Sequence, residues 1–469
     1  MTAVNLTRIQ RRLIVAIVLS AAFLSVLTQF LLITAFPKIM SAFEINSTEV
    51  QWLTTSYMLT IAVLIPITAY FIDKFQTRKL MMSAMFLFFA GTLICLIAPS
   101  FPTLIVGRVI QGMGSGIMIP LMQTLLFLLY PKEKRGYAMG LAGLVINVAP
   151  AVGPPISGVV ISYFEWRSLF LITLPIAACI LLFTFFYMRN ITEQRKTDID
   201  ILSIILSTLG FGGLLYGFNN IQEGGITDPV TLTSLITGTL ALGLFVVRQL
   251  RLETPILEIR VLKVPVFALI AFVSILSFSL LISIETILPM YVQNAQQFSA
   301  YYGGLIVMPG ALTLAAMSLL AGRLFDKYGG KTIAIIGFVL LSLSTLGFHL
   351  ILGLHTPFII TMGLFMVAMG GVALINMPIM TAGINALPDK LIPHGTAVIN
   401  TARQFGGSLG LTFIISFISN VASGTEAVVQ PANYLTGVKT AFFVAFLFAV
   451  TGLLLSLFLE REKQPAESG

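Results

Sequence analysis

The chain has 469 residues, of which 57% are hydrophobic and 10% are charged, and its mean hydropathy is +0.97. An average soluble domain has about a quarter of its residues charged. The composition therefore excludes a soluble enzyme and indicates an integral membrane protein. The net charge of +8 raises the question of a nucleic-acid partner, which the positions of the basic residues answer below.

The apolar runs predict membrane-spanning helices in chain order. The first run follows Arg8, Arg11 and Arg12 as a secretory signal would, but it exceeds the roughly 15 residues of a signal core and is long enough to span. Runs of about 20 residues predict fourteen spans. They lie near 13–36, 52–72, 80–98, 104–127, 137–162, 168–188, 200–218, 230–248, 266–292, 302–322, 332–352, 357–385, 396–420 and 437–459. The expected fold is all-α and polytopic.

The basic residues predict the orientation of these spans. If the N-terminus is cytoplasmic, only Lys38, Arg167 and Lys439 fall outside and only Arg108 and Arg403 fall within spans, which leaves 22 of the 27 inside. Such a bias predicts an even number of spans with both termini in the cytoplasm. The positive charge is thus explained by topology, and no nucleic-acid partner is expected.

An internal repeat divides the chain. Asp73, at the end of the second predicted span, and Asp326, at the end of the tenth, are 253 residues apart, and the same offset relates Asn147 to Asn400 and Gly153 to Gly406. Duplicated helical halves are typical of alternating-access carriers. The sequence therefore predicts a six-helix bundle over 1–190, a two-helix insert with its linkers over 191–262, and a second six-helix bundle over 263–469.

Several motifs carry a family resemblance. They are the two Asp-containing turns, Arg108-x-x-Gln-Gly112, Gly153-Pro154-x-x-Ser157-Gly158, Trp166-Arg167-x-x-Phe170, and the stretch from Asp200 to Gly212. In this order the chain resembles the major facilitator superfamily, specifically its 14-helix drug:proton antiporters and most closely the lincomycin-exporter-like branch. The resemblance implies proton-coupled export of amphipathic drugs across the cell membrane, and with it antibiotic resistance.

Two groups of motif residues are expected to act in the transport cycle. Asp73 with Arg78, and Asp326 with Lys331, are candidates for a cytoplasmic gate, in which each carboxylate pairs with a basic residue or a helix N-terminus. The alternative is a charged turn that only sets topology. Gly153, Pro154 and Gly158 are candidates for a kinked antiporter hinge, and the alternative there is an ordinary small-residue helix contact.

Buried charges give the remaining site candidates, because an ionisable group inside a membrane is costly and by default functional. Glu285 is the single acid well inside a predicted span, and Arg108 and Gln29 fall at a comparable depth. We expect these three to form an outward polar cluster for proton coupling, with a hydrogen-bonded interfacial glutamate as the alternative. The family usually has an acid in the first span, where this chain has Leu27-Thr28-Gln29-Phe30.

Arg403, beside Asn400 in the thirteenth predicted span, is a candidate inner-cavity residue. It is expected to snorkel to the interface, to pair with carbonyl groups, or to meet an anionic substrate.

The chemistry expected of the chain is transport without catalysis. His349, His355 and His394 have no cysteine or carboxylate at ligand spacing, so neither a metal nor another cofactor is expected. No segment between spans is long enough for an ATPase, so the expected energy source is the proton gradient. The expected partners are small amphipathic drugs, protons and the lipid bilayer, and the expected state is a monomer. The alternative function is a carrier or flippase for an endogenous lipid, peptide or metabolite.

Overall fold

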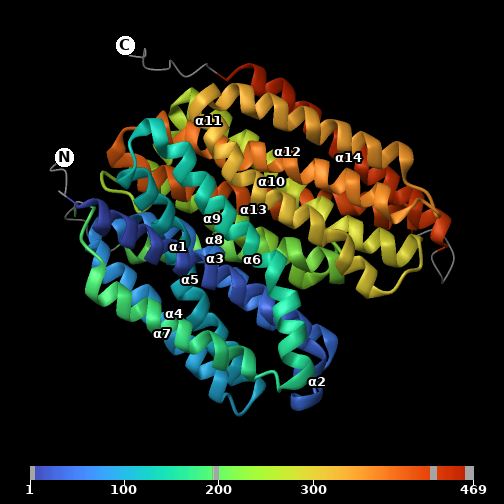
Figure 1. Ribbon diagram of the computed structural model, residues 1–469, viewed down its shortest axis with the longest axis horizontal. Coiled ribbons are helices and arrows are strands. Elements are labelled where there is room, and N and C mark those ends of the chain that lie inside the picture. Colours follow the sequence, from blue (N-terminus) through green and yellow to red (C-terminus); the bar gives the residue numbers. More distant parts are fainter. Residues whose placement is uncertain (1–5, 193, 195–199, 423–429, 460–469) are drawn as a thin grey trace.

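The computed structural model describes residues 6–192, 194, 200–422 and 430–459, and in these the chain forms a bundle of long helices (Figure 1). In a lipid environment every backbone amide and carbonyl must be satisfied within the protein, which long helices achieve. The apolar runs therefore become helices over nearly their whole length. Arg195, Lys196, Arg461 and Lys463, which contribute to the predicted orientation, lie outside the described residues.

The helices that precede the insert are here called the first bundle. They are α1 (Arg8–Leu31), α2 (Phe36–Phe43), α3 (Ser47–Lys74), α4 (Thr77–Ile97), α5 (Phe101–Leu129), α6 (Arg135–Tyr163) and α7 (Ser168–Tyr187). The short α2 continues the first predicted span past a 3₁₀ turn at Ile33–Ala35.

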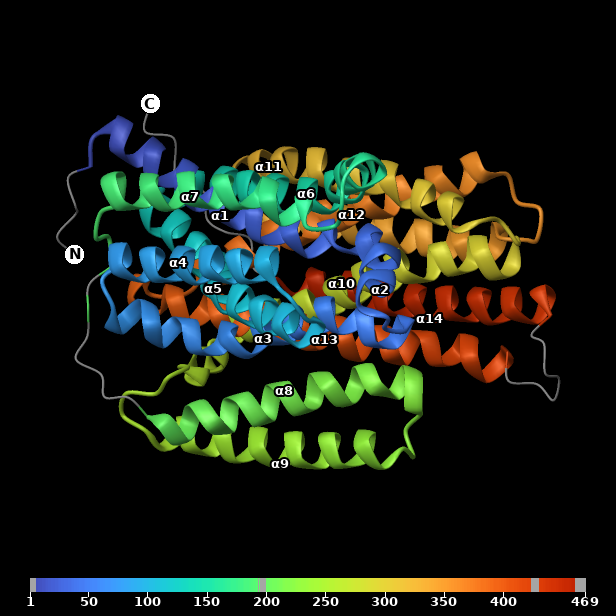
Figure 2. The same cartoon turned by 90° about the horizontal axis from the view of Figure 1, so that it is seen from below.

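The insert is a helical hairpin of α8 (Ile201–Gly224) and α9 (Pro229–Arg251). The two helices pack along each other at one side of the molecule, where α8 contacts α3 and α13 (Figure 2). A linker then leads through a 3₁₀ turn at Ile259–Lys263 to the next helix.

The remaining helices are here called the second bundle. They are α10 (Pro265–Met290), α11 (Ala300–Ile351), α12 (Phe358–Asn385), α13 (Ile392–Ala422) and α14 (Pro431–Leu457). A π-helical turn, Tyr291–Ala295, extends α10.

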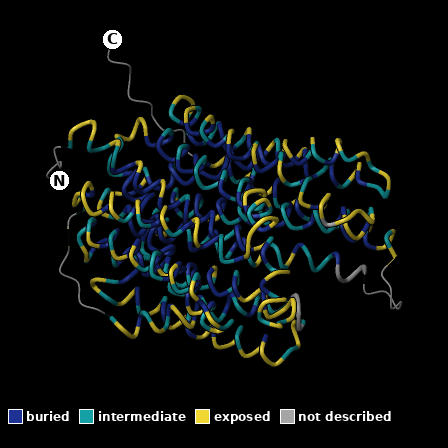
Figure 3. Tube along the Cα trace, turned by 60° about the horizontal axis from the view of Figure 1, so that its bottom comes forward, coloured by how far each residue is buried: buried dark blue, intermediate teal, exposed yellow. Residues whose placement is uncertain are grey.

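Buried residues concentrate along the centres of the bundles, while large apolar side chains stay exposed on the outside (Figure 3). Phe183 and Phe186 of α7 and Leu240 and Leu244 of α9 are each at least half exposed. Such a surface is stable against lipid and not against water. The chain is a multi-pass membrane protein.

The number of candidate spans differs from the predicted fourteen. Among the described residues, twelve helical segments are long and apolar enough to cross a membrane. The tenth and eleventh predicted spans both fall in the 52-residue α11, and α13, which covers the thirteenth, is not among the twelve.

Glycine explains how α11 contains two predicted spans. Gly329 interrupts the helical backbone with φ 77° and ψ 166°, a conformation that side chains with a Cβ rarely adopt. In the first copy of the repeat the matching residue is Gln76, the N-cap of α4, with φ −58° and ψ 132°. The first copy, which has glutamine in place of this glycine, thus makes its turn without a positive φ.

Candidate functional site

The two repeated aspartates both reach from one bundle to the other. We call the end of the molecule where they lie the basic end, because Lys74, Arg78 and Lys331 lie there too. Asp326 of α11 accepts hydrogen bonds from the backbone N–H groups of Gly136 and Tyr137, each at 2.8 Å. These are the first residues of α6, where backbone donors lack helical partners and the helix dipole favours an anion.

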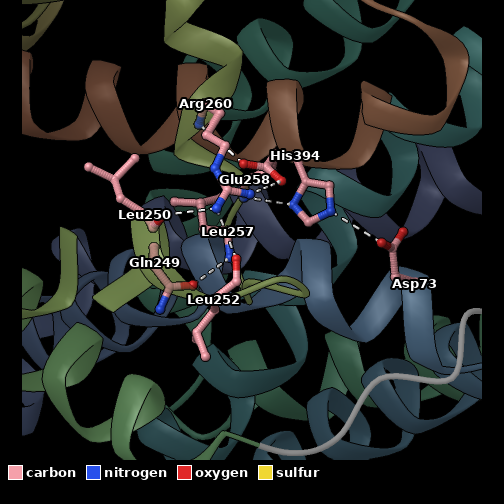
Figure 4. A network of polar contacts seen from close by, with 8 residues as sticks. All are labelled: Asp73, Gln249, Leu250, Leu252, Leu257, Glu258, Arg260 and His394. Atoms are coloured by element: carbon pink, nitrogen blue, oxygen red, sulfur yellow. Dashed lines mark hydrogen bonds and ion pairs between the residues drawn. The ribbon is translucent and has the colours of Figure 1, made fainter. Parts of the chain in front are cut away.

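Asp73 makes the corresponding contact from the first bundle to the second. Its Oδ2 lies 3.1 Å from Nε2 of His394, in the first turn of α13 (Figure 4). Nδ1 of the same imidazole lies 3.1 Å from the backbone nitrogen of Glu258, in the linker after α9. The first bundle, the second bundle and the insert's linker therefore meet at His394.

A third contact between the bundles lies beside these two. Arg135, at the start of α6, forms an ion pair with Asp389 at 3.2 Å and donates to Oδ1 of Asn385 at 3.1 Å. The Arg135 side chain is buried, whereas that of Asp389 is 38% exposed, so the ion pair lies at the edge of the interface between the bundles. Three polar contacts thus hold the basic end closed.

The basic residues predicted to pair with the aspartates have other partners, each within its own bundle. Arg78 donates to the carbonyl of Phe185 near the end of α7, and Lys331 donates to the carbonyl of Leu457 at the end of α14, at 2.6 Å. Helix C-termini expose unpaired carbonyls and carry partial negative charge, which explains this choice. The contacts across the bundles come from the carboxylates instead.

Glycines bring α6 and α11 into direct backbone contact near Asp326. A Cβ on Gly136 would lie 2.4 Å from Oδ1 of Asp326, and a Cβ on Gly322 would lie 2.2 Å from the Gly136 carbonyl oxygen. Only glycine leaves room for this crossing.

The hinge candidates lie farther along α6, which stays helical through Pro150, Pro154 and Pro155. A Cβ on Gly153 would meet Phe30 of α1 at 3.1 Å, whereas one on Gly158 would meet nothing within 4 Å. Close helix approach is therefore seen at Gly153 and not at Gly158.

Asn400 and Arg403, the inner-cavity candidates, lie one turn apart on α13. Asn400 donates its amide to Oε1 of Gln123 on α5 at 2.5 Å, so it joins the bundles rather than facing open space. The guanidinium of Arg403 lies 4.8 Å from the centre of the Phe278 ring and makes no hydrogen bond or ion pair in the described part of the chain. Its side chain is only 8% exposed.

Arg108 is held inside the first bundle. Its Nε donates to the Leu53 carbonyl at 3.0 Å, its Nη1 donates to Oε1 of Gln111, and the guanidinium lies 4.0 Å from the Tyr57 ring centre. Nη2 has no hydrogen-bond partner among the residues that the structure describes. This arginine is fully buried between α3 and α5.

The expected cluster of Glu285, Arg108 and Gln29 is not joined by hydrogen bonds or ion pairs in this structure. Glu285 is half-buried on α10, which packs within the second bundle, while the Arg108 side chain turns toward α3. Within the described residues neither Glu285 nor Gln29 has a hydrogen-bond partner. The three residues lie on α1, α5 and α10, and Arg108 bonds to Leu53 of α3 instead.

Sequence reasoning missed His394, Arg135 and Asp389. The repeat does not point to His394, because its offset equates Gly136 and Tyr137, the partners of Asp326, with Asp389 and Lys390. No spacing rule reveals the pairing of Arg135 with Asp389, since it depends on how the bundles dock.

Comparisons with known proteins agree with this architecture. The family model described as the Major Facilitator Superfamily matches residues 18–411. The chain is 48% identical to the uncharacterised MFS-type transporter YcnB of Bacillus subtilis (strain 168), over 99% of this chain and 98% of that one. It is 39% identical to the lincomycin resistance protein LmrB of Listeria monocytogenes, over 96% and 97% respectively.

A solved structure shares the fold at low sequence identity. The human organic anion transporter MFSD10 matches with a TM-score of 0.67 and 14% identity, covering 95% of this chain and 99% of that one. With the family match and the two relatives, this makes the chain a transporter and not an enzyme. The chain belongs to the major facilitator superfamily.

Proposed function

We propose that this transporter exports amphipathic drugs, lincosamides or other lipophilic antibiotics, and that it does so by alternating access driven by the proton gradient. The observation that carries the proposal is the set of contacts at the basic end. Asp326 with the α6 N-terminus, Asp73 with His394, and Arg135 with Asp389 all cross between bundles. Polar contacts of this kind are individually modest, so a rocking motion can break and remake them.

The identity to LmrB supports the substrate class, because the similarity extends over nearly the whole of both chains. The division into 1–190, 191–262 and 263–469 is part of the proposal, with the two six-helix units moving against each other. Counting α11 as two crossings and α13 as one raises the twelve candidate spans to fourteen. An even number places both termini on one side, and we assign the basic end to the cytoplasm of a cell-membrane protein.

Glu285 is the residue that we assign to proton coupling. It lies well inside α10 and has no basic partner among the described residues, so its carboxyl group is free to take up and release a proton. Thr28 and Gln29, at the place of the usual family acid, do not titrate in the physiological range. Arg108 and Gln29 belong to the same proposed outer region, and Asn400 and Arg403 to the inner one. No cofactor is needed, and a monomer suffices.

A drug-susceptibility panel tests this function. Cells that lack their own exporters would express the wild-type chain or Glu285→Gln, with and without a protonophore. We expect resistance to lipophilic antibiotics only with the wild-type chain and only without the protonophore. Unchanged susceptibility together with an envelope or metabolite defect on deletion would instead favour a carrier or flippase for an endogenous lipid, peptide or metabolite.

A further inference from the structure

The linker between α9 and α10 is unusually well fixed for a connection between membrane helices. Ile256, Leu257 and Val261 are buried. Arg260 donates from Nη2 to the carbonyls of Leu250 and Leu252, at 2.8 and 3.0 Å, which closes the linker back onto the end of α9 (Figure 4). The segment is therefore a packed element and not a tether.

This linker helps to fix the tautomer and the orientation of His394. The backbone N–H of Glu258 can only donate, so Nδ1 of His394 must accept with its lone pair. In that tautomer Nε2 carries the hydrogen and donates it to Asp73. The acceptor-only Asp73 carboxylate requires the same tautomer, and the linker supports it by holding the ring with Nε2–H toward Asp73 through a backbone group that belongs to neither bundle.

The linker is in turn anchored to the base of the insert. The Leu257 N–H donates to Oε1 of Gln249 at 3.2 Å, and the Gln249 amide donates to Oγ of Ser203 at 2.7 Å. Asp200 then accepts from Ser203 at 2.6 Å and binds the Arg248 guanidinium through both carboxylate oxygens. These hydrogen bonds, continued through the backbone from Leu257 to Glu258, connect the hairpin of α8 and α9 to the Asp73 contact.

We propose that the linker after α9 is a working part of the gate at the basic end: it fixes His394 as the hydrogen-bond donor to Asp73 and so couples the two-helix insert to closure of that end. His394 acts as a positioning residue and does not contact the substrate. The proposal rests on the alternating access of the proposed function, but not on its substrate or energy source.

Distances between spin labels on the two bundles report whether the basic end is closed. Lys79→Cys on α4 and Ala386→Cys at the end of α12 are exposed positions on opposite bundles. With Cys95 and Cys179 replaced by alanine, these two sites take nitroxides for double electron–electron resonance in purified protein. The measured quantity is the ratio of the long-distance to the short-distance population, with neither drug nor proton gradient present.

The test is a double-mutant cycle between the linker anchor and His394. Gln249→Met keeps the side-chain volume but removes both anchoring bonds. We expect it to raise the ratio of open to closed forms roughly two- to tenfold, the range for weakening one hydrogen bond, that between His394 and Asp73. In a His394→Gln background the new side-chain amide can donate to Asp73 whether or not the linker is in place. Gln249→Met should then change the ratio less than about twofold.

Controls separate the gate from general destabilisation. Asn220→Ala removes bonds to Asp228 and Thr231 at the opposite end of the same hairpin, and it should leave the ratio unchanged. Size-exclusion chromatography shows whether Gln249→Met folds. If it does not, Ser203→Ala repeats the test, because it removes the hydrogen bond that holds the Gln249 amide.

The outcomes are decisive in each case. No shift with Gln249→Met, or an equal shift in both backgrounds, overturns the coupling through His394 while leaving the proposed function intact. A chain that shows one distance in every variant overturns the coupling and the alternating access together. If the double-mutant cycle shows the expected coupling but the drug-susceptibility panel shows no resistance, only the proposed substrate class is overturned.

Discussion

Asn147 and Asn400 occupy the same position in the two copies of the repeat, and each donates its side-chain amide to the opposite bundle. Asn147 on α6 donates to Oγ of Ser318 at 3.0 Å, and Asn400 on α13 donates to Oε1 of Gln123 at 2.5 Å. The pair lies farther along α6 and α13 than the residues that Asp326 and Asp73 contact at the starts of these helices. The bundles are therefore joined by two pseudo-symmetric layers of polar contacts.

Removing this inner layer should favour the form in which the basic end is open. We expect Asn147→Ala and Asn400→Ala each to raise the open population severalfold, because each removes one bond of about 1 kcal/mol. The double variant should show the product of the two effects, since the sites lie on different helices. Spin-label distances across the basic end measure this, and a change confined to one of the two variants would contradict a symmetric role.

Glu285→Gln should abolish proton-driven drug efflux while leaving the fold intact. The amide keeps the size of the side chain but cannot exchange a proton. Transport into everted membrane vesicles measures the effect, with Glu165→Gln, an exposed acid in the connection between α6 and α7, as the matched control. Unchanged pH-dependent transport by Glu285→Gln would contradict the assignment of Glu285 to proton coupling.

Asp326→Asn should slow turnover more than it weakens substrate binding. The amide oxygen accepts hydrogen bonds less strongly than a carboxylate and no longer interacts with the α6 dipole, a loss of roughly 1–2 kcal/mol in the closed form. Transport rates in proteoliposomes and equilibrium drug binding separate the two quantities. An effect confined to binding affinity would count against the gate.

Gly136→Ala should disrupt the crossing of α6 and α11, whereas Gly158→Ala on the same helix should not. A Cβ at 136 would meet Asp326 and the Gly322 carbonyl at 2.4 and 2.5 Å, and a Cβ at 158 would meet nothing within 4 Å. We expect the free energy of unfolding to fall by roughly 1–3 kcal/mol for the first variant only. Thermal unfolding in detergent compares the two, and equal stability would show that the backbones separate freely.

The Asp200–Arg248 pair should contribute to stability in a pH-dependent way. Its hydrogen bond to Arg248 holds the pKa of the Asp200 carboxyl below the usual value. A lowered pKa stabilises the fold above the unfolded value of about 4, and this contribution is lost as the pH falls through the lowered pKa. Asp200→Asn should therefore reduce the melting temperature slightly, on the order of 1–3 °C, at neutral pH.

This difference from the wild-type chain should stay constant down to about pH 4 and disappear below it. Arg248→Gln should reproduce the loss, and Arg251→Gln, an exposed neighbour at the end of α9, should not. A difference that grows toward acid pH would have the wrong sign for this pair.

Much of the fold was predictable because lipid restricts the options. An apolar run of about 20 residues must become a helix, so the predicted ranges match the helices closely, and the 253-residue offset identified Asp326 and Asp73 as equivalent. The predicted cluster of Glu285, Arg108 and Gln29 was different. Depth along a helix follows from residue number, but the direction of a side chain across the bundle does not, and Arg108 turns to Leu53 and Tyr57.

The sequence by itself determined that this is a membrane protein with an internal repeat, because hydropathy, the distribution of basic residues and the repeat are local or periodic properties of the chain. Only the tertiary structure decided the partners at the basic end. Asp73 meets His394 across 321 positions of sequence, and the linker that orients His394 comes from a third region. Such contacts arise from the docking of separate helical units, which no local pattern encodes.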